Sequence, residues 1–212
     1  MTKFLLFAYG AMMCPSVVAK RGVTPAREPF PARLRSDDLA LSFSHRAAYA
    51  TLTSRGDDAS GLCRRRPFGV VIELDASDFA RVAEREVGYR IAEVVVERLG
   101  VDSDHGARCV SVEALAFVST WGMELIDGPL PPTARYRGLI LDGLERYGIR
   151  AYEAEGGAAY VEWVRSLPTV EDCDIARDPA YSKTGVELAT RVGFGVATLA
   201  AAAAAAAAGS IR

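Results

Sequence analysis

The sequence predicts an α+β domain, because segments with the two-residue period of strands and segments with helical spacing both occur along it. The most informative stretch is residues 68–97, FGVVIELDASDFARVAEREVGYRIAEVVVE. Its apolar run at residues 68–72 is rich in β-branched residues, which favour a strand. A short helix is expected next, ending near Glu86 because Gly88 is typical of a chain leaving a helix. A second strand is expected over residues 89–96.

The short helix has local signals at both ends. Asp75 and Ser77 are two N-cap candidates, and Phe79 and Val82 fall on one face of the helix. The order strand, helix, strand places the carboxylate of Glu86 at a helix-to-strand junction. Such a junction can direct a side chain into a cavity.

Other segments show similar patterns. Strands are expected at residues 3–9, 39–44, 49–53 and 107–120, with the 39–44 strand half-buried because its apolar residues alternate. Helices are expected at residues 133–147, where Gly148 supplies a stop, and at residues 158–167, which Pro168 ends. Loops are expected at residues 20–35, 54–66, 100–106 and 121–132.

The length of 212 residues allows one domain and a tail. We expect a domain over residues 1–167, an acidic linker over 168–185 and an Ala-rich, low-complexity tail over 186–212, which includes nine consecutive alanines. That tail is too weakly apolar for a membrane span, and residues 4–7 are too short for the core of a signal peptide. We therefore expect a cytoplasmic protein without membrane attachment.

Composition excludes few classes outright but disfavours several. With 25 basic and 27 acidic residues the formal charge is −2, which argues against a nucleic-acid partner. The run Arg64–Arg65–Arg66 is interpreted as a solvated loop facing Asp57 and Asp58, with an anion site as the alternative.

Cysteine and histidine usage points away from metal and disulfide chemistry. The four cysteines show no ligand spacing and no C-x-x-C pair, so neither a disulfide nor a zinc site is expected. The sequence at residues 102–105, DSDH, looks like a metal loop, but such polar runs are more often turns. Only two histidines are present, which disfavours a Ser-His-Asp enzyme.

The first expected strand ends in Tyr9-Gly10-Ala11-Met12. A glycine here permits a turn whose successive N–H groups can form an anion-binding nest. The alternative is an ordinary glycine that ends a strand.

These two motifs together resemble the γ-glutamylcyclotransferase-like family. Arg85, Glu86 and Tyr89 match an Arg-Glu pair near a Tyr, in which the Glu is the acid–base. The segment FAYGAMM is similar to the family's Tyr-Gly-Ser-x recognition loop, except that Ala11 replaces the Ser. Tyr136 matches a Tyr that lies near the pocket on a late helix, although it is equally explained as a core anchor.

The resemblance covers residues 3–167 and implies a compact α+β fold with a mixed, barrel-like sheet and flanking helices. It also implies an enzyme that releases 5-oxoproline and a free amine or amino acid from a γ-glutamyl compound, without cofactor or metal. Glu86 is then catalytic, and the substrate-binding residues are Tyr9, Gly10, Ala11, Met12, Tyr89 and Tyr136. We expect the protein to bind this small substrate. We expect it to be a monomer or a homodimer.

Two points stay open at the level of sequence. Glu84 is a rival carboxylate, but on a helix it points about 200° away from Glu86, so only one of them can face the pocket. The chain can also be a binding module that keeps the cavity without catalysis, or a related acyltransferase or amine-specific cyclotransferase.

Overall fold

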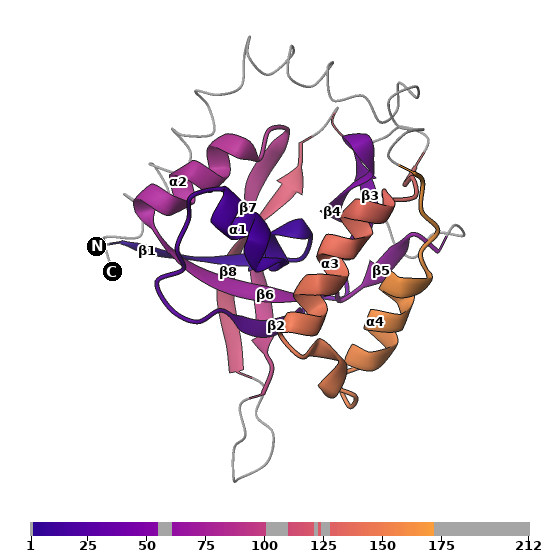
Figure 1. Ribbon diagram of the computed structural model, residues 1–212. Coiled ribbons are helices and arrows are strands. Elements are labelled where there is room, and N and C mark those ends of the chain that lie inside the picture. Colours follow the sequence, from indigo (N-terminus) through magenta and orange to yellow (C-terminus); the bar gives the residue numbers. More distant parts are fainter. Residues whose placement is uncertain (1, 55–60, 101–109, 121–122, 124–127, 172–212) are drawn as a thin grey trace.

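The computed structural model describes residues 2–54, 61–100, 110–120, 123 and 128–171 of the chain. Its centre is a closed barrel (Figure 1). The barrel strands are, in spatial order, β1 (Lys3–Ala8), β6 (Phe68–Asp75), β2 (Phe30–Leu34), β7 (Tyr89–Arg98) and β8 (Val110–Ser119). All neighbours are antiparallel except β8 and β1, whose parallel pairing of Leu115 with Leu6 closes the barrel. The α+β fold with a mixed, barrel-like sheet is confirmed.

The barrel interior explains the apolar run at the start of the 68–97 stretch. All residues of β6 from Phe68 to Ile72 are buried, so the strand shows a continuous apolar run rather than an alternation. On β7, by contrast, Val94 and Val96 are buried while Val95 is exposed, as expected for a strand with one face in the core.

A smaller sheet lies beside the barrel in the order β4 (Tyr49–Thr53), β3 (Ala40–His45) and β5 (Cys63–Arg65). The two strands expected at residues 39–44 and 49–53 are confirmed as an antiparallel pair. The expectation that the first is half-buried is wrong, because every residue of β3 is buried. The alternation of polar and apolar residues does not report burial here, because the polar Ser42 and Ser44 also lie in the interior, at 1% and 4% exposure.

The helix before Glu86 forms as the sequence predicts. Helix α2 (Ala76–Arg85) begins after Asp75, whose carboxylate accepts a hydrogen bond from the Asp78 backbone N–H at 2.8 Å. Its buried Phe79 stacks against Phe4 and Phe117 with ring centroids 4.8 and 6.0 Å apart. This packing holds the first half of α2 against the barrel.

The two late helices are confirmed and lie side by side in Figure 1, α3 (Ala134–Arg146) next to α4 (Gly157–Ser166). Thr133 caps α3 by accepting a hydrogen bond from the Tyr136 backbone N–H at 3.0 Å. Helix α3 also packs on a short 3-10 turn, η1 (Ala11–Met13). The approach is close because Gly143 lacks a side chain, and a Cβ there would lie 2.4 Å from the Met13 Cβ.

Two predicted loops contain regular structure. The loop expected at residues 20–35 holds β2, which lies between two strands although Pro31 lacks an N–H. The proline is tolerated because pairing of β2 with β7 begins only at the next residue, Ala32. The loop expected at residues 54–66 holds β5, and a further short helix, α1 (Pro15–Lys20), begins at a proline in a helix-starting position.

Arg66 lies in the expected solvated loop, yet it donates to the Glu97 carboxylate at 3.0 Å. Asp57, Asp58, the DSDH segment at 102–105, the turn expected at 100–106 apart from its first residue, and residues 172–212 with the tail lie outside the described residues. Within the described ranges, no helix is long and apolar enough to cross a membrane.

Candidate active site

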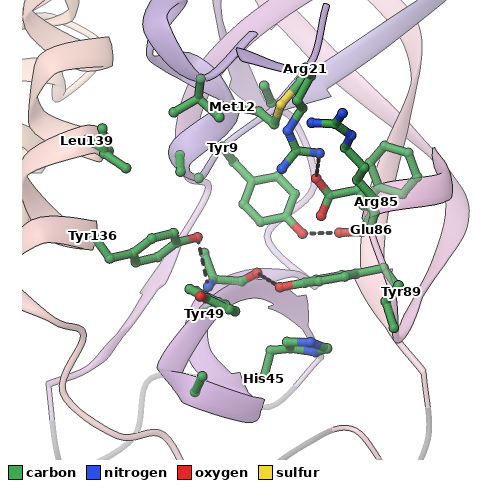
Figure 2. Close-up of a pocket in the computed structure, with 18 of the residues that line it drawn as sticks. Tyr9, Met12, Arg21, His45, Tyr49, Arg85, Glu86, Tyr89, Tyr136 and Leu139 are labelled. Atoms are coloured by element: carbon green, nitrogen blue, oxygen red, sulfur yellow. Dashed lines mark hydrogen bonds and ion pairs between the residues drawn. The ribbon is translucent and has the colours of Figure 1, made fainter. Parts of the chain in front are cut away.

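A cavity of about 770 Å³ opens where the end of β1, the end of α2, the smaller sheet and the start of α3 meet (Figure 2). The structure brings all seven residues predicted from the sequence to its wall. They are Tyr9, Gly10, Ala11, Met12, Glu86, Tyr89 and Tyr136. Their convergence locates the candidate site, while the role of each residue stays a prediction.

Glu86 is the residue that immediately follows α2. Its backbone N–H donates to Ala83 O at 3.2 Å, and its carbonyl accepts from the Tyr89 N–H at 3.1 Å. Gly88, with φ of +83°, completes this tight turn into β7. The turn directs the Glu86 side chain, which is 15% exposed, into the cavity. Glu84 is exposed and does not line the cavity, as the helical geometry predicts.

An ion pair joins the Glu86 carboxylate to the guanidinium of Arg21 (Figure 2). Burial raises the pKa of Glu86, and the positive charge and hydrogen bond of Arg21 oppose that shift. The balance is a net rise of the pKa above its ordinary value. Sequence reasoning missed Arg21, which lies in the segment expected to be an extended loop.

The segment that carries Arg21 is tied to α2 along its length. Arg85 donates to Lys20 O at 3.3 Å, and Arg81 donates to Gly22 O at 3.0 Å. The Thr24 N–H donates to the Asp78 carboxylate at 3.1 Å. These contacts place Arg21 beside Glu86 without requiring any sequence motif around it.

Tyr9 directly follows β1 and turns its ring toward Glu86, as Figure 2 shows. Its hydroxyl donates to the Phe117 carbonyl. Burial raises the pKa of Tyr9 well above 10.0, and the nearby Tyr136 and Glu86 raise it further. The phenol is therefore neutral at physiological pH.

Tyr89 and Tyr136 both bond to the backbone of one residue, Ala50. The Tyr89 hydroxyl donates to Ala50 O at 3.0 Å, and the Ala50 N–H donates to the Tyr136 hydroxyl oxygen at 3.2 Å. Burial raises the pKa of both phenols, so both keep their protons. Because Tyr136 accepts in this bond, its own proton remains available for donation.

The turn after Tyr9 forms as predicted, but not because glycine is needed for a left-handed backbone conformation. Gly10 has φ of −119°, so a left-handed backbone, which favours glycine, is not what the turn requires. The bonds of the turn use the N–H groups of Met13 and Cys14, at 3.0 Å each. No hydrogen bond between described residues takes the N–H of Met12, a residue that lines the cavity.

His45 is a second residue that sequence reasoning missed. Its buried ring stacks on Tyr89 with centroids 4.0 Å apart and shares a hydrogen bond of 2.6 Å with the Ser119 hydroxyl. Burial, aided by the charge of Arg46, lowers the pKa of His45 to about 4. The ring is therefore neutral and acts as a rigid support for Tyr89. Its position at the end of a predicted strand was the only signal available.

The described part of the chain contains neither a cluster of metal-ligating side chains nor a disulfide. No group of three or more His, Cys, Asp or Glu side chains is placed there to hold a metal ion. The two cysteines that fall in the described ranges, Cys14 and Cys63, are buried free thiols.

The barrel, its flanking helices and the cavity define the γ-glutamylcyclotransferase-like fold, which this chain has. A solved structure named gamma-glutamyl cyclotransferase is similar over 91% of this chain and 100% of its own, with a TM-score of 0.59 and 19% identity. An uncharacterized Homo sapiens protein, loc79017, matches 80% of this chain and 90% of its own, with a TM-score of 0.56 and 19% identity.

YkqA from Bacillus subtilis matches 80% of this chain and 57% of its own, with a TM-score of 0.57 and 21% identity. No family model and no curated protein matches the sequence. At these identities the solved structures establish the fold, and the chemistry has to be argued from the site.

Proposed function

We propose that this protein is an enzyme that cleaves γ-glutamyl compounds by intramolecular aminolysis and releases 5-oxoproline with a free amine or amino acid. One observation carries the proposal. Glu86, a largely buried carboxylate at the junction of α2 and β7, lines the same cavity as the turn that follows Tyr9. The fold shared with the solved gamma-glutamyl cyclotransferase supports the reaction class.

The substrate carries its own nucleophile. Its α-amine attacks its γ-carbonyl carbon, a five-membered ring closes, and the bond to the leaving nitrogen breaks. Holding the two ends together supplies most of the entropic advantage, since effective molarities of oriented intramolecular reactions reach about 10⁵ M or more. The protein then has to move protons and stabilise the oxyanion.

Glu86 is assigned both proton transfers. It accepts a proton from the α-ammonium or from the attacking amine, and later returns it to the departing nitrogen. A pKa raised above its ordinary value makes the carboxylate a better base. Arg21 favours the ionised form in which Glu86 has to meet the substrate.

The turn from Tyr9 to Met12 is assigned to the substrate carboxylate and the developing oxyanion. Met12 lines the cavity, and no hydrogen bond between described residues takes its N–H, so this donor is assigned to the ligand. The Tyr136 hydroxyl, held by the Ala50 N–H, is a second neutral donor. Ala11 removes the hydroxyl that a serine would offer, so backbone groups and tyrosines have to supply this binding.

A non-catalytic module that binds a small metabolite or a partner is the second candidate. The ion pair of Glu86 with Arg21 favours it, because a carboxylate engaged by a guanidinium is a weaker base. The lost hydroxyl at Ala11 points the same way.

The deciding assay follows 5-oxoproline release from γ-glutamyl amino acids, γ-glutamylamines and glutathione. Glu86→Gln keeps the shape of the side chain but removes the base, so turnover should fall by about 10²- to 10⁴-fold while the fold is retained. Glu84→Gln, at an exposed site outside the cavity, is the matched control and should change little. Unchanged turnover in Glu86→Gln would end this mechanism, and no turnover by the wild type on the whole panel would favour the binding module.

A further inference from the structure

The cavity wall carries an excess of positive charge. Among the described residues that line it, the charged side chains are four arginines and a single carboxylate. They are Arg21, Arg46, Arg85, Arg135 and Glu86. The lowered pKa of His45 keeps that ring neutral, so it does not alter the balance.

Two of the four arginines already have partners. Arg21 forms the ion pair with Glu86, and Arg85 donates to the Lys20 carbonyl. Arg46 and Arg135, by contrast, form no side-chain hydrogen bond or ion pair with any residue in the described ranges. Arg46 is half-buried, where an unpartnered guanidinium gains most from a carboxylate.

These two arginines come from elements that meet on the wall supplied by the smaller sheet and α3. Arg46 begins the short turn η2 (Arg46–Ala48) and lies three residues before Tyr49, while Arg135 directly precedes Tyr136. The rings of Tyr49 and Tyr136 are in contact, with centroids 5.0 Å apart. Glu86 and Arg21, in contrast, belong to α2 and the segment after α1.

We propose that the cavity selects γ-glutamyl compounds whose leaving amine is an acidic amino acid, with Arg46 and Arg135 receiving its two carboxylates. This inference rests on the proposed cyclotransfer. The γ-glutamyl group is a zwitterion of no net charge, so only the leaving part differs in charge between substrates. A leaving glutamate or aspartate brings two negative charges to two arginines that have no other partner among the described residues.

The test uses a series of substrates that differ in charge but little in shape. γ-Glutamylglutamate and γ-glutamylglutamine are nearly isosteric and differ by one negative charge, and γ-glutamylpropylamine carries neither carboxylate. We expect kcat/KM for the glutamate compound to exceed that for the glutamine compound by about tenfold, mainly through KM, because charged Arg–carboxylate bonds are strong. The advantage should shrink as salt is added.

Of the variants Arg46→Gln and Arg135→Gln, the one that removes the arginine facing the side-chain carboxylate should reduce the glutamate-to-glutamine ratio toward one. The other removes the arginine facing the α-carboxylate, which both compounds carry, and should lower kcat/KM for both. Arg90→Gln is the matched control, because Arg90 is exposed on β7 and does not line the cavity, yet the variant loses the same charge. The control should keep the wild-type ratio. Arg135 is exposed, so its variant remains informative if a change at the Arg46 turn disturbs folding.

Equal kcat/KM values for the two compounds in the wild type would overturn the inference and leave the cyclotransfer intact. A ratio that persists in both arginine variants would overturn the assignment as well. Turnover of another γ-glutamyl compound of the panel but of neither of these two would overturn the inference alone. If the wild type turns over no member of the panel, the proposed function fails, and calorimetric binding decides the selectivity. Tighter binding of γ-glutamylglutamate then supports the charge preference, and equal binding of the two rejects it.

Discussion

The hydroxyl of Tyr136 occupies the space that any side chain at position 10 would need. A Cβ on Gly10 would lie 2.8 Å from the Tyr136 hydroxyl oxygen and 3.4 Å from the Ala50 Cβ. Because φ at Gly10 is −119°, the glycine is not there to supply a left-handed backbone, and this contact gives the reason for it. The contact links the turn after β1 to α3 across the cavity.

That contact predicts a rescue. Gly10→Ala and Gly10→Val should weaken binding of a γ-glutamyl ligand, because the new Cβ displaces the Tyr136 hydroxyl. Tyr136→Phe removes the clashing oxygen, so Gly10→Ala should cost much less in that background than in the wild type. Isothermal calorimetry on the wild type, the two single variants and the double variant measures the coupling. Ala11→Ser should be tolerated, and normal binding by Gly10→Val would place the site elsewhere.

Arg21 is predicted to set the pH at which Glu86 becomes active. Its charge lowers the pKa of Glu86, so Arg21→Gln should raise that pKa. Because Glu86 has to be deprotonated to accept a proton, the acidic limb of the kcat/KM profile should move to higher pH. Arg21→Lys keeps the charge and should move it less. An acidic limb at the wild-type position in Arg21→Gln would mean that another group titrates there.

His45 is predicted to make the fold sensitive to acid. Its pKa falls from 6.5 to about 4 in the folded protein, so the unfolded chain binds more protons between these values. The free energy of unfolding should therefore fall as the pH drops from about 6.5 toward 4, by up to about 3 kcal/mol from this residue. Urea unfolding of the wild type and His45→Gln across this range isolates the contribution. Parallel pH dependences in the two proteins would contradict it.

Truncation is predicted to separate the folded domain from the expected linker and tail. Removal of everything after Pro179 should leave Tm within a few degrees, because we expect the linker and tail to bury little area with the domain. A cut after Leu167 should lower Tm more. It removes Val170, whose N–H donates to Pro132 O and whose carbonyl accepts from the Ala134 N–H, each at 3.2 Å. A large loss on cutting after Pro179 would show that the tail packs on the domain.

Local signals in the sequence were sufficient for the central unit and for the carboxylate. The buried strand before Asp75, the cap at Asp75 and the glycine turn at Gly88 each act over a few residues, so their outcome can be predicted from neighbouring letters. The same holds for the helical phase that separates Glu86 from Glu84. The barrel and the cavity residues were predicted from the resemblance of two short motifs to the γ-glutamylcyclotransferase-like family.

The partners of those residues depended on contacts between distant parts of the chain. Arg21 is 65 residues from Glu86, and His45 is 74 residues from Ser119. Strand β2 was missed because prolines in and around it are typical of a loop, and β3 was predicted to be half-buried because serine is usually exposed.

The sequence by itself therefore determined the strand–helix–strand unit and where Glu86 stands, since caps, turns and periodicity are local properties. Only the tertiary structure decided which groups surround that carboxylate. Contacts of the segment after α1 with α2 bring Arg21 to it, and placing the smaller sheet against α3 lets the backbone of Ala50 hold Tyr89 and Tyr136. Charge, burial and hydrogen bonding at the site result from that packing, because each depends on the distance between atoms and not on their order in the chain.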